Sequence, residues 1–259
     1  MPTLRHNALA VLLEPDADRK CLQGRALQPA GPTGAADAIA LPPGIPGRPA
    51  RPALVAPTEI RQRSLATPEG HAALIHALAH IELNAIDLAA DAAWRFSGMP
   101  DDYYRDWIRV AQEEALHFSL LRDHLRGMGF AYGDFPAHNA LWEMAERTRH
   151  DVLARVALVP RTMEARGLDA SPAVRDKLVS VGDKAGAAIV DVILRDEIGH
   201  VAVGNRWYAW LCARRGLEPI ATYRELTRSH RAPRLRGPFN LAARAAAGFS
   251  PAELQALSE

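Results

Sequence analysis

Two Glu-x-x-His pairs carry residue types that are well suited to hold a metal ion. Glu114 and His117 lie in the segment EEALHF, and Glu197 and His200 lie in the segment DEIGH. Residues three positions apart share one face of a helix, so each pair would present a carboxylate and an imidazole side by side. Apolar residues recur at helical spacing around both pairs, which predicts that they point inward. Burying either group without a partner costs several kcal/mol, and a metal ion offsets that cost for both.

A lone glutamate precedes each pair at a matched distance. Glu82 lies 32 residues before Glu114, and Glu164 lies 33 residues before Glu197, so the pattern Glu…Glu-x-x-His occurs twice. Each interval suits one helical hairpin. Two lone glutamates and two such pairs, one unit per helix, describe the di-metal carboxylate site of a ferritin-like four-helix bundle. The predicted metal ligands are Glu82, Glu114, His117, Glu164, Glu197 and His200.

An acidic residue, Glu113 or Asp196, stands directly before the glutamate of each pair. One position along a helix turns the side chain by about 100°, so these acids would point toward a neighbouring helix. Metal-bound histidines usually donate their second N–H group to a carboxylate. We therefore expect hydrogen bonds from His117 to Asp196 and from His200 to Glu113.

The ligand set contains only oxygen and nitrogen donors and leaves positions open for water, oxygen or substrate. Such a site suits two iron ions, or two manganese ions, better than a structural zinc ion. A helical bundle with buried, hydrogen-bonded Glu and His side chains and no metal is the alternative. It is disfavoured because a buried glutamate is rare unless it is paired. Beyond the metal ligands, the sequence identifies no catalytic residue and no site for an organic cofactor.

Four long helices would position these groups. The first is expected from Thr67 to about Phe96, and the second from Pro100 to the glycines of RGMGF. The third is expected over about residues 138–166, kinked or split at Pro160 and ended by Gly167. A further segment would begin at Ser171 and Pro172, and the fourth helix would run over about 183–215.

The predicted fold is all-α, with three parts. Residues 1–66 would form an N-terminal helical segment and a proline-rich strap that packs on the bundle rather than being disordered. Residues 67–216 would form the four-helix bundle, and residues 217–259 a basic loop with short helices. In the strap, the expected apolar anchors are Ile39, Leu41, Ile45, Leu54 and Val55.

Charge and cysteine content narrow the class of protein. The net charge is +1, which gives no general attraction to nucleic acid or membranes. Cys21 and Cys212 are too few for a disulfide framework, and no apolar run is long enough to span a membrane, so we expect a cytoplasmic protein. One basic run, Arg224 to Arg236, holds five arginines and one acid. It is interpreted as a solvated face or a source of salt bridges, or alternatively as a patch for phosphate, a cofactor tail or RNA.

Long segments of the chain resemble a bacterial family of ferritin-like proteins that is catalogued as a domain of unknown function. They are HALAHIELNAIDLAADAAWRF, EEALHF, YGDFPAHNALW, EARGLD, DEIGHVAVGNRWY and GPFNLAARAAAGF. This resemblance implies a ferritin-like bundle with a di-metal centre and no established substrate. More distantly, the doubled motif is similar to bacterial multicomponent monooxygenases, ribonucleotide reductase small subunits and the di-iron tRNA hydroxylase that acts on an isopentenylated adenosine. That likeness implies the same six ligands, with Glu113 and Asp196 supporting the histidines.

The favoured function is an oxidoreductase that activates dioxygen at a di-iron centre and oxidises an unknown small-molecule or RNA substrate. It would use an external electron donor, and a homodimer is compatible with it. Three alternatives stay open: a manganese enzyme that removes peroxide, a metal-binding or storage protein without turnover, and a tRNA-modifying hydroxylase. Classical ferritins usually lack the histidine of the second pair, and the cysteine-rich iron module of rubrerythrins is absent. Both departures count against storage and against a self-contained peroxidase.

Overall fold

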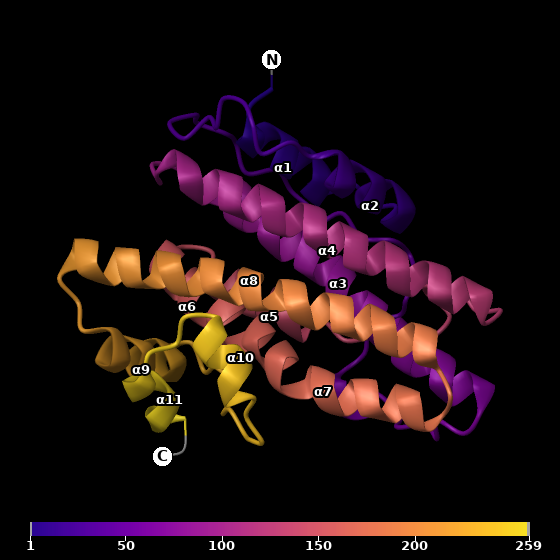
Figure 1. Ribbon diagram of the computed structural model, residues 1–259. Coiled ribbons are helices and arrows are strands. Elements are labelled where there is room, and N and C mark those ends of the chain that lie inside the picture. The colour runs from indigo at the N-terminus through magenta and orange to yellow at the C-terminus, as the bar shows by residue number, and fades with distance from the viewer. Residues whose placement is uncertain (1, 258–259) are drawn as a thin grey trace. The chain divides into compact units, whose positions relative to one another are not determined.

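The computed structural model describes residues 2–257, and within this range the chain forms helices and no β-strand (Figure 1). An isolated parallel bridge between Leu54 and Ala137 is the exception to helix and loop. The predicted all-α class is therefore confirmed. Two compact units, Met1–Trp142 and Glu143–Glu259, make up the chain, and each is described by itself. The predicted division into strap, bundle and tail stays a prediction.

The first unit is built on two long helices, α3 (Pro68–Arg95) and α4 (Asp101–Gly127), which pack against each other along their length (Figure 1). The short helices α1 (Leu4–Leu13) and α2 (Ala17–Ala26) pack on α3 and α4, respectively. The short loop between α3 and α4 makes them antiparallel. Both long helices agree with their predicted ranges.

Local sequence explains where these helices begin. The Thr67 side chain accepts a hydrogen bond from the Gly70 amide, and Pro68 occupies the first helical position, where its missing N–H group costs nothing. Asp101 and Asp102 place negative charge at the positive end of α4. By length and composition α3 could cross a membrane, but 72% of its most apolar window is buried inside the protein. A core helix gives the same pattern.

The proline-rich strap makes hydrogen bonds to the rest of the first unit. Val55 donates its amide to the Ala137 carbonyl over 2.9 Å, and Ala137 donates to Ala53 over 3.0 Å. The buried Lys20 ammonium donates to the Gly47 carbonyl over 2.8 Å. Two of the expected apolar anchors, Leu41 and Leu54, are instead exposed, by 65% and 42%. The other three anchors, Ile39, Ile45 and Val55, are half-buried.

The second unit is built around the long helix α8 (Lys184–Arg215). Its partners are α6 (Val152–Leu158), the π-helix η2 (Val159–Glu164) and α7 (Ala165–Ser180), all of which pack against α8 (Figure 1). Helix α5 (Ala140–Arg147) contains the boundary between the units. The predicted fourth helix, about 183–215, agrees with α8.

The helical segment predicted over about residues 138–166 has a break before Pro160 that the sequence did not predict. The chain turns after Arg147, and the Asp151 side chain then accepts the Leu153 amide and begins α6. Asp favours such a capping position because its carboxylate competes for backbone amides. At Pro160, where a kink or a split was expected, the chain forms the π-helix η2.

The predicted helix end at Gly167 and the new start at Ser171 are also wrong, because α7 runs through Pro172 to Ser180. A proline inside a helix leaves the carbonyl four residues earlier without its amide donor. Here that carbonyl belongs to Leu168, and the Asn240 side-chain amide donates to it over 3.2 Å. A contact 72 residues away in sequence therefore stabilises a helix that local sequence would end.

The C-terminal segment packs on the second unit through α9 (Pro219–Ser229), α10 (Leu241–Ala246) and α11 (Pro251–Ala256). Ser250 and Glu253 form a capping box at the start of α11. Arg244 on α10 is fully buried and donates to both carboxylate oxygens of Asp169 on α7, over 2.9 and 2.7 Å. This charge-assisted pair fixes the tail to the helix beneath it.

A pH-dependent stability is expected from His76 on α3. This buried side chain accepts a hydrogen bond from the Gly133 amide at Nε2 over 2.9 Å, which requires a neutral ring. Burial lowers the pKa of His76 from 6.5 to about 4. The resulting stabilisation is complete above pH 6.5 and is lost as the pH falls toward 4. Between pH 7 and pH 5 the wild-type unfolding free energy should fall by about 2 kcal/mol more than that of His76→Gln.

Glutamine serves as the matched control because its side-chain oxygen can still accept the Gly133 amide. Urea unfolding at both pH values measures the difference. Equal losses of unfolding free energy in wild type and His76→Gln would show that this histidine does not set the acid sensitivity.

Candidate metal centre

Three of the predicted ligands meet in the first unit. Glu82 on α3 is 3% exposed, and Glu114 and His117 on α4 are fully buried. The apolar residues around them, such as Ile86 on α3 and Phe118 on α4, are buried as well. The 3.6-residue period of both helices therefore turns two carboxylates and an imidazole into the contact between α3 and α4.

The imidazole of His117 lies between the two carboxylates. Its Nδ1 atom is 3.2 Å from Glu82 Oε2 and 3.3 Å from Glu114 Oε2. Each of the three side chains offers one ligand atom, and these atoms lie within 4.8 Å of one another. The contact between Glu82 and His117 joins residues 35 positions apart, as the hairpin spacing predicts.

Burial and mutual charge perturb these groups in a consistent way. Burial raises the pKa of Glu82, and the nearby Glu114 carboxylate raises it further. Burial alone would lower the pKa of His117, but hydrogen bonds to Glu114 and Glu82 outweigh it and raise that pKa. Without metal, the arrangement therefore favours a positively charged imidazole held between acidic oxygens.

This buried acidic and imidazole group could bind a metal ion. Two carboxylates and one imidazole are hard or intermediate donors, and first-row divalent metals accept all three. A cation among them would meet the negative charge of the carboxylates, which burial otherwise makes costly. The residues present thus fit a metal ion in both donor type and spacing.

The second Glu-x-x-His pair lies in the second unit, on α8. Glu197 is 6% exposed and His200 is 1% exposed, and His200 Nδ1 lies 3.8 Å from Glu197 Oε2. Val190, Ile193 and Val201 on the same helix are also buried. The pair therefore sits on the apolar face of α8, as its sequence pattern predicts.

Glu164 is half-buried and is the last residue of the π-helix η2. The Pro160 nitrogen cannot donate, and the Thr162 hydroxyl donates to the carbonyl of Ala157, five residues earlier, over 2.8 Å. A π-helical turn changes the rotation per residue, so it changes the direction in which the following side chain points. Such turns occur frequently at functional sites.

One residue that positions this element was not identified from the sequence. Gly204 lies on α8 one turn beyond His200, and a Cβ atom there would come within 2.7 Å of the Pro160 ring. Only a glycine lets η2 approach α8 this closely. A glycine inside a long, otherwise regular helix was the available signal, because it weakens a helix unless packing requires it.

The acids expected to orient the histidines are half-buried. Asp196 accepts hydrogen bonds from Arg195, its neighbour in sequence, over 2.8 and 3.1 Å. The predicted bonds from His117 to Asp196 and from His200 to Glu113 would join residues of different units, and they stay predictions.

Comparisons with known proteins show a family and no activity. The model of a family described as "Protein of unknown function (DUF455)" matches residues 13–255. An uncharacterized protein of Haemophilus influenzae is 49% identical over 218 residues, which cover 82% of this chain and 76% of that relative. No solved structure matches the chain.

Metal binding by the first unit can be tested in the full chain. Replacing Glu114 by Gln keeps the side-chain shape but removes a buried anionic ligand, so affinity for Mn²⁺ should fall by at least roughly tenfold. Asp123→Asn, on the exposed side of the same helix, is the matched control and should bind as the wild type does. Isothermal titration calorimetry gives the affinities. Unchanged Mn²⁺ affinity in a folded Glu114→Gln protein would exclude this glutamate as a ligand.

Proposed function

The chain belongs to the DUF455 family of proteins of unknown function, and we propose that it is a di-metal carboxylate oxidoreductase. In this proposal a ferritin-like bundle holds two iron ions, which react with dioxygen to oxidise an organic substrate. The observation that carries the proposal is the buried meeting of Glu82, Glu114 and His117 on two antiparallel helices.

The repeated sequence pattern supports a second half of the site. Glu164 and the pair on α8 repeat the spacing of the first half, and the pair on α8 is buried on an apolar face. A single metal ion would not require the pattern twice, whereas a di-metal bundle takes one carboxylate unit from each of four helices. The proposed ligands are Glu82, Glu114, His117, Glu164, Glu197 and His200.

When bound, two iron ions would supply reducing electrons for dioxygen, and the side chains of this protein would supply charge balance, orientation and exclusion of water. The negatively charged glutamates would neutralise much of the positive charge of the ions. Each carboxylate could offer one or both of its oxygens to an ion. The histidines act as neutral donors. Buried apolar residues of α3 and α4, including Ile86 and Phe118, keep bulk water away from the group. A dry site strengthens each electrostatic contact within it.

The donor set also bears on the alternatives. Both cysteines are free and buried, and neither belongs to the candidate ligand group, so the site has no thiolate of the kind a structural zinc site uses. Oxygen and nitrogen ligands hold manganese as readily as iron, so peroxide removal by a manganese form is the second candidate. It differs from the first in its reactant, and therefore in a simple assay.

Oxygen uptake by the chemically reduced iron-loaded protein tests the proposed function without knowledge of the substrate. We expect oxygen consumption in proportion to bound iron, and a loss of at least roughly 100-fold in rate in Glu114→Ala, because a metal ligand is gone. Asp123→Asn again serves as the control. Oxygen consumption that is unchanged in Glu114→Ala would contradict the proposed oxidoreductase function. Rapid peroxide disproportionation by the manganese form, with no oxygen uptake by the iron form, would favour the second candidate.

A further inference from the structure

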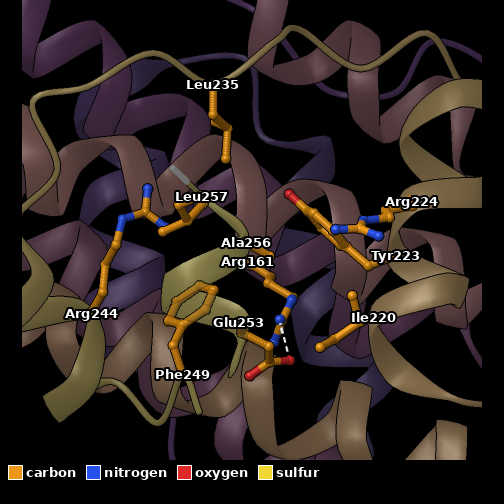
Figure 2. Close-up of a pocket in the computed structure, with 10 residues that line it drawn as sticks. All are labelled: Arg161, Ile220, Tyr223, Arg224, Leu235, Arg244, Phe249, Glu253, Ala256 and Leu257. Atoms are coloured by element: carbon orange, nitrogen blue, oxygen red, sulfur yellow. Dashed lines mark hydrogen bonds and ion pairs between the residues drawn. The ribbon is translucent and has the colours of Figure 1, made fainter. Parts of the chain in front are cut away.

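The second unit contains a pocket that is separate from the proposed ligands. It has a cavity volume of about 90 Å³ and lies among η2, α9, α10, α11 and the loop that follows α9 (Figure 2). Segments more than 90 residues apart in sequence form its wall, from Arg161 to Leu257. No predicted metal ligand lines it, so a role for this pocket goes beyond the proposed function.

Two buried guanidinium groups form one side of the pocket. Arg161 on η2 donates to Glu253 over 2.5 Å and to Asn205 over 2.7 Å. Arg244 on α10 is held by Asp169. The ring of Phe249 packs against both guanidinium carbons, at 4.6 Å from Arg161 and 5.3 Å from Arg244. These contacts hold the two cations in place before any ligand arrives, which lowers the entropic cost of binding.

Each of the two buried arginines has one nitrogen atom that donates no hydrogen bond within the described residues. Arg161 is 4% exposed and Arg244 is fully buried, yet Arg161 Nε and Arg244 Nη1 have no hydrogen-bond partner among the residues that the structure describes. A buried donor without an acceptor costs about 1–3 kcal/mol. An acceptor on a bound molecule would remove that free-energy cost. A purely structural role for the two arginines would leave both donors unsatisfied.

The charges around the pocket favour an anion. Arg224 on α9 is exposed and adds a third guanidinium group to the lining. Glu253 is the carboxylate in the lining, and Arg161 already engages it. The loop that contributes Leu235 also carries Arg234 and Arg236, so positive charge extends along this side of the unit.

The remaining wall is apolar. Ile220 and Tyr223 on α9, Leu235 on the loop and Leu257 after α11 line it, and Figure 2 shows these side chains around the same space as the three arginines. An inorganic anion would leave this surface uncovered. A molecule with an anionic group and an apolar body would satisfy both kinds of wall.

We propose that this pocket binds a small amphipathic anion. Its carboxylate or phosphate group would lie toward Arg224 and the N–H groups of Arg161 and Arg244, and its apolar body would lie against Ile220, Leu235 and Leu257. Arg224 is the lining guanidinium group chosen for replacement, because it is exposed whereas Arg161 and Arg244 are buried.

Calorimetric titration of the full metal-loaded protein with octanoate, octyl phosphate and octanol tests the proposal. We expect saturable binding of at least one anion and roughly tenfold weaker binding of octanol, which matches the body without the charge. The stronger of the two anions identifies the head group. Arg224→Gln should weaken the anion roughly tenfold, whereas Arg228→Gln on the same helix, outside the lining, should change it little. Leu235→Ser should weaken anion and octanol alike.

Three results would overturn the proposal. One is no saturable binding of either anion, and another is equal binding of anion and octanol. The third is binding that survives Arg224→Gln and Leu235→Ser but is lost in Glu114→Gln, because the anion would then bind at the candidate metal centre. Failure of the proposed oxygen chemistry would leave the comparison between Arg224→Gln and Arg228→Gln intact, so the two proposals fail independently.

Discussion

The free-energy cost of burying ionisable groups is the physical constraint on which the rest of this structure depends. An apolar helix pair buries two carboxylates and an imidazole at one place, and none of the three can reach bulk solvent. The contacts of His117 Nδ1 with Glu82 and Glu114 offset part of that cost. A proton on the imidazole and a metal cation would each place positive charge beside the two carboxylates. The positively charged imidazole therefore explains how two carboxylates can be buried at one place.

In the first unit, the regular helices α3 and α4 bring the three buried side chains together. The second unit contains an irregular element, the π-helix η2. Capping by Thr67 sets the register of α3, so that Glu82 falls on the face that meets α4. In the second unit, the π-helix that begins beside Pro160 ends at Glu164, and Gly204 allows this turn to pack closely on α8. The π-helix and the glycine both lower local helix stability, and they occur beside a predicted ligand.

Sequence reasoning succeeded where local physics decides the outcome. Caps and helical period gave the ends of α3, α4 and α8, and they placed Glu114 and His117 on one buried face. Matched spacing also anticipated the contact of Glu82 with His117, because a hairpin of two equal helices leaves little freedom. The proposed joining of this set with Glu164, Glu197 and His200 still rests on the repeat in the sequence.

Sequence reasoning failed where a distant side chain overrides local preference. Pro172 should end a helix, and α7 continues because Asn240 supplies the missing donor to Leu168. The pocket was equally hidden, since Arg161 and Arg244 gave only the appearance of surface charge. Their partners, Glu253 and Asp169, are 92 and 75 residues away, and no periodic pattern links them.

The central claim is that four helices bring their carboxylate and imidazole groups to one pair of metal ions. An anomalous-scattering map of freshly purified, metal-loaded crystals, recorded on both sides of the iron absorption edge, tests it most directly. The account predicts two neighbouring peaks, both in contact with the side chains named as ligands. A map with no peak beside Glu114 and His117, or with a single peak that Glu197 and His200 do not touch, would contradict it.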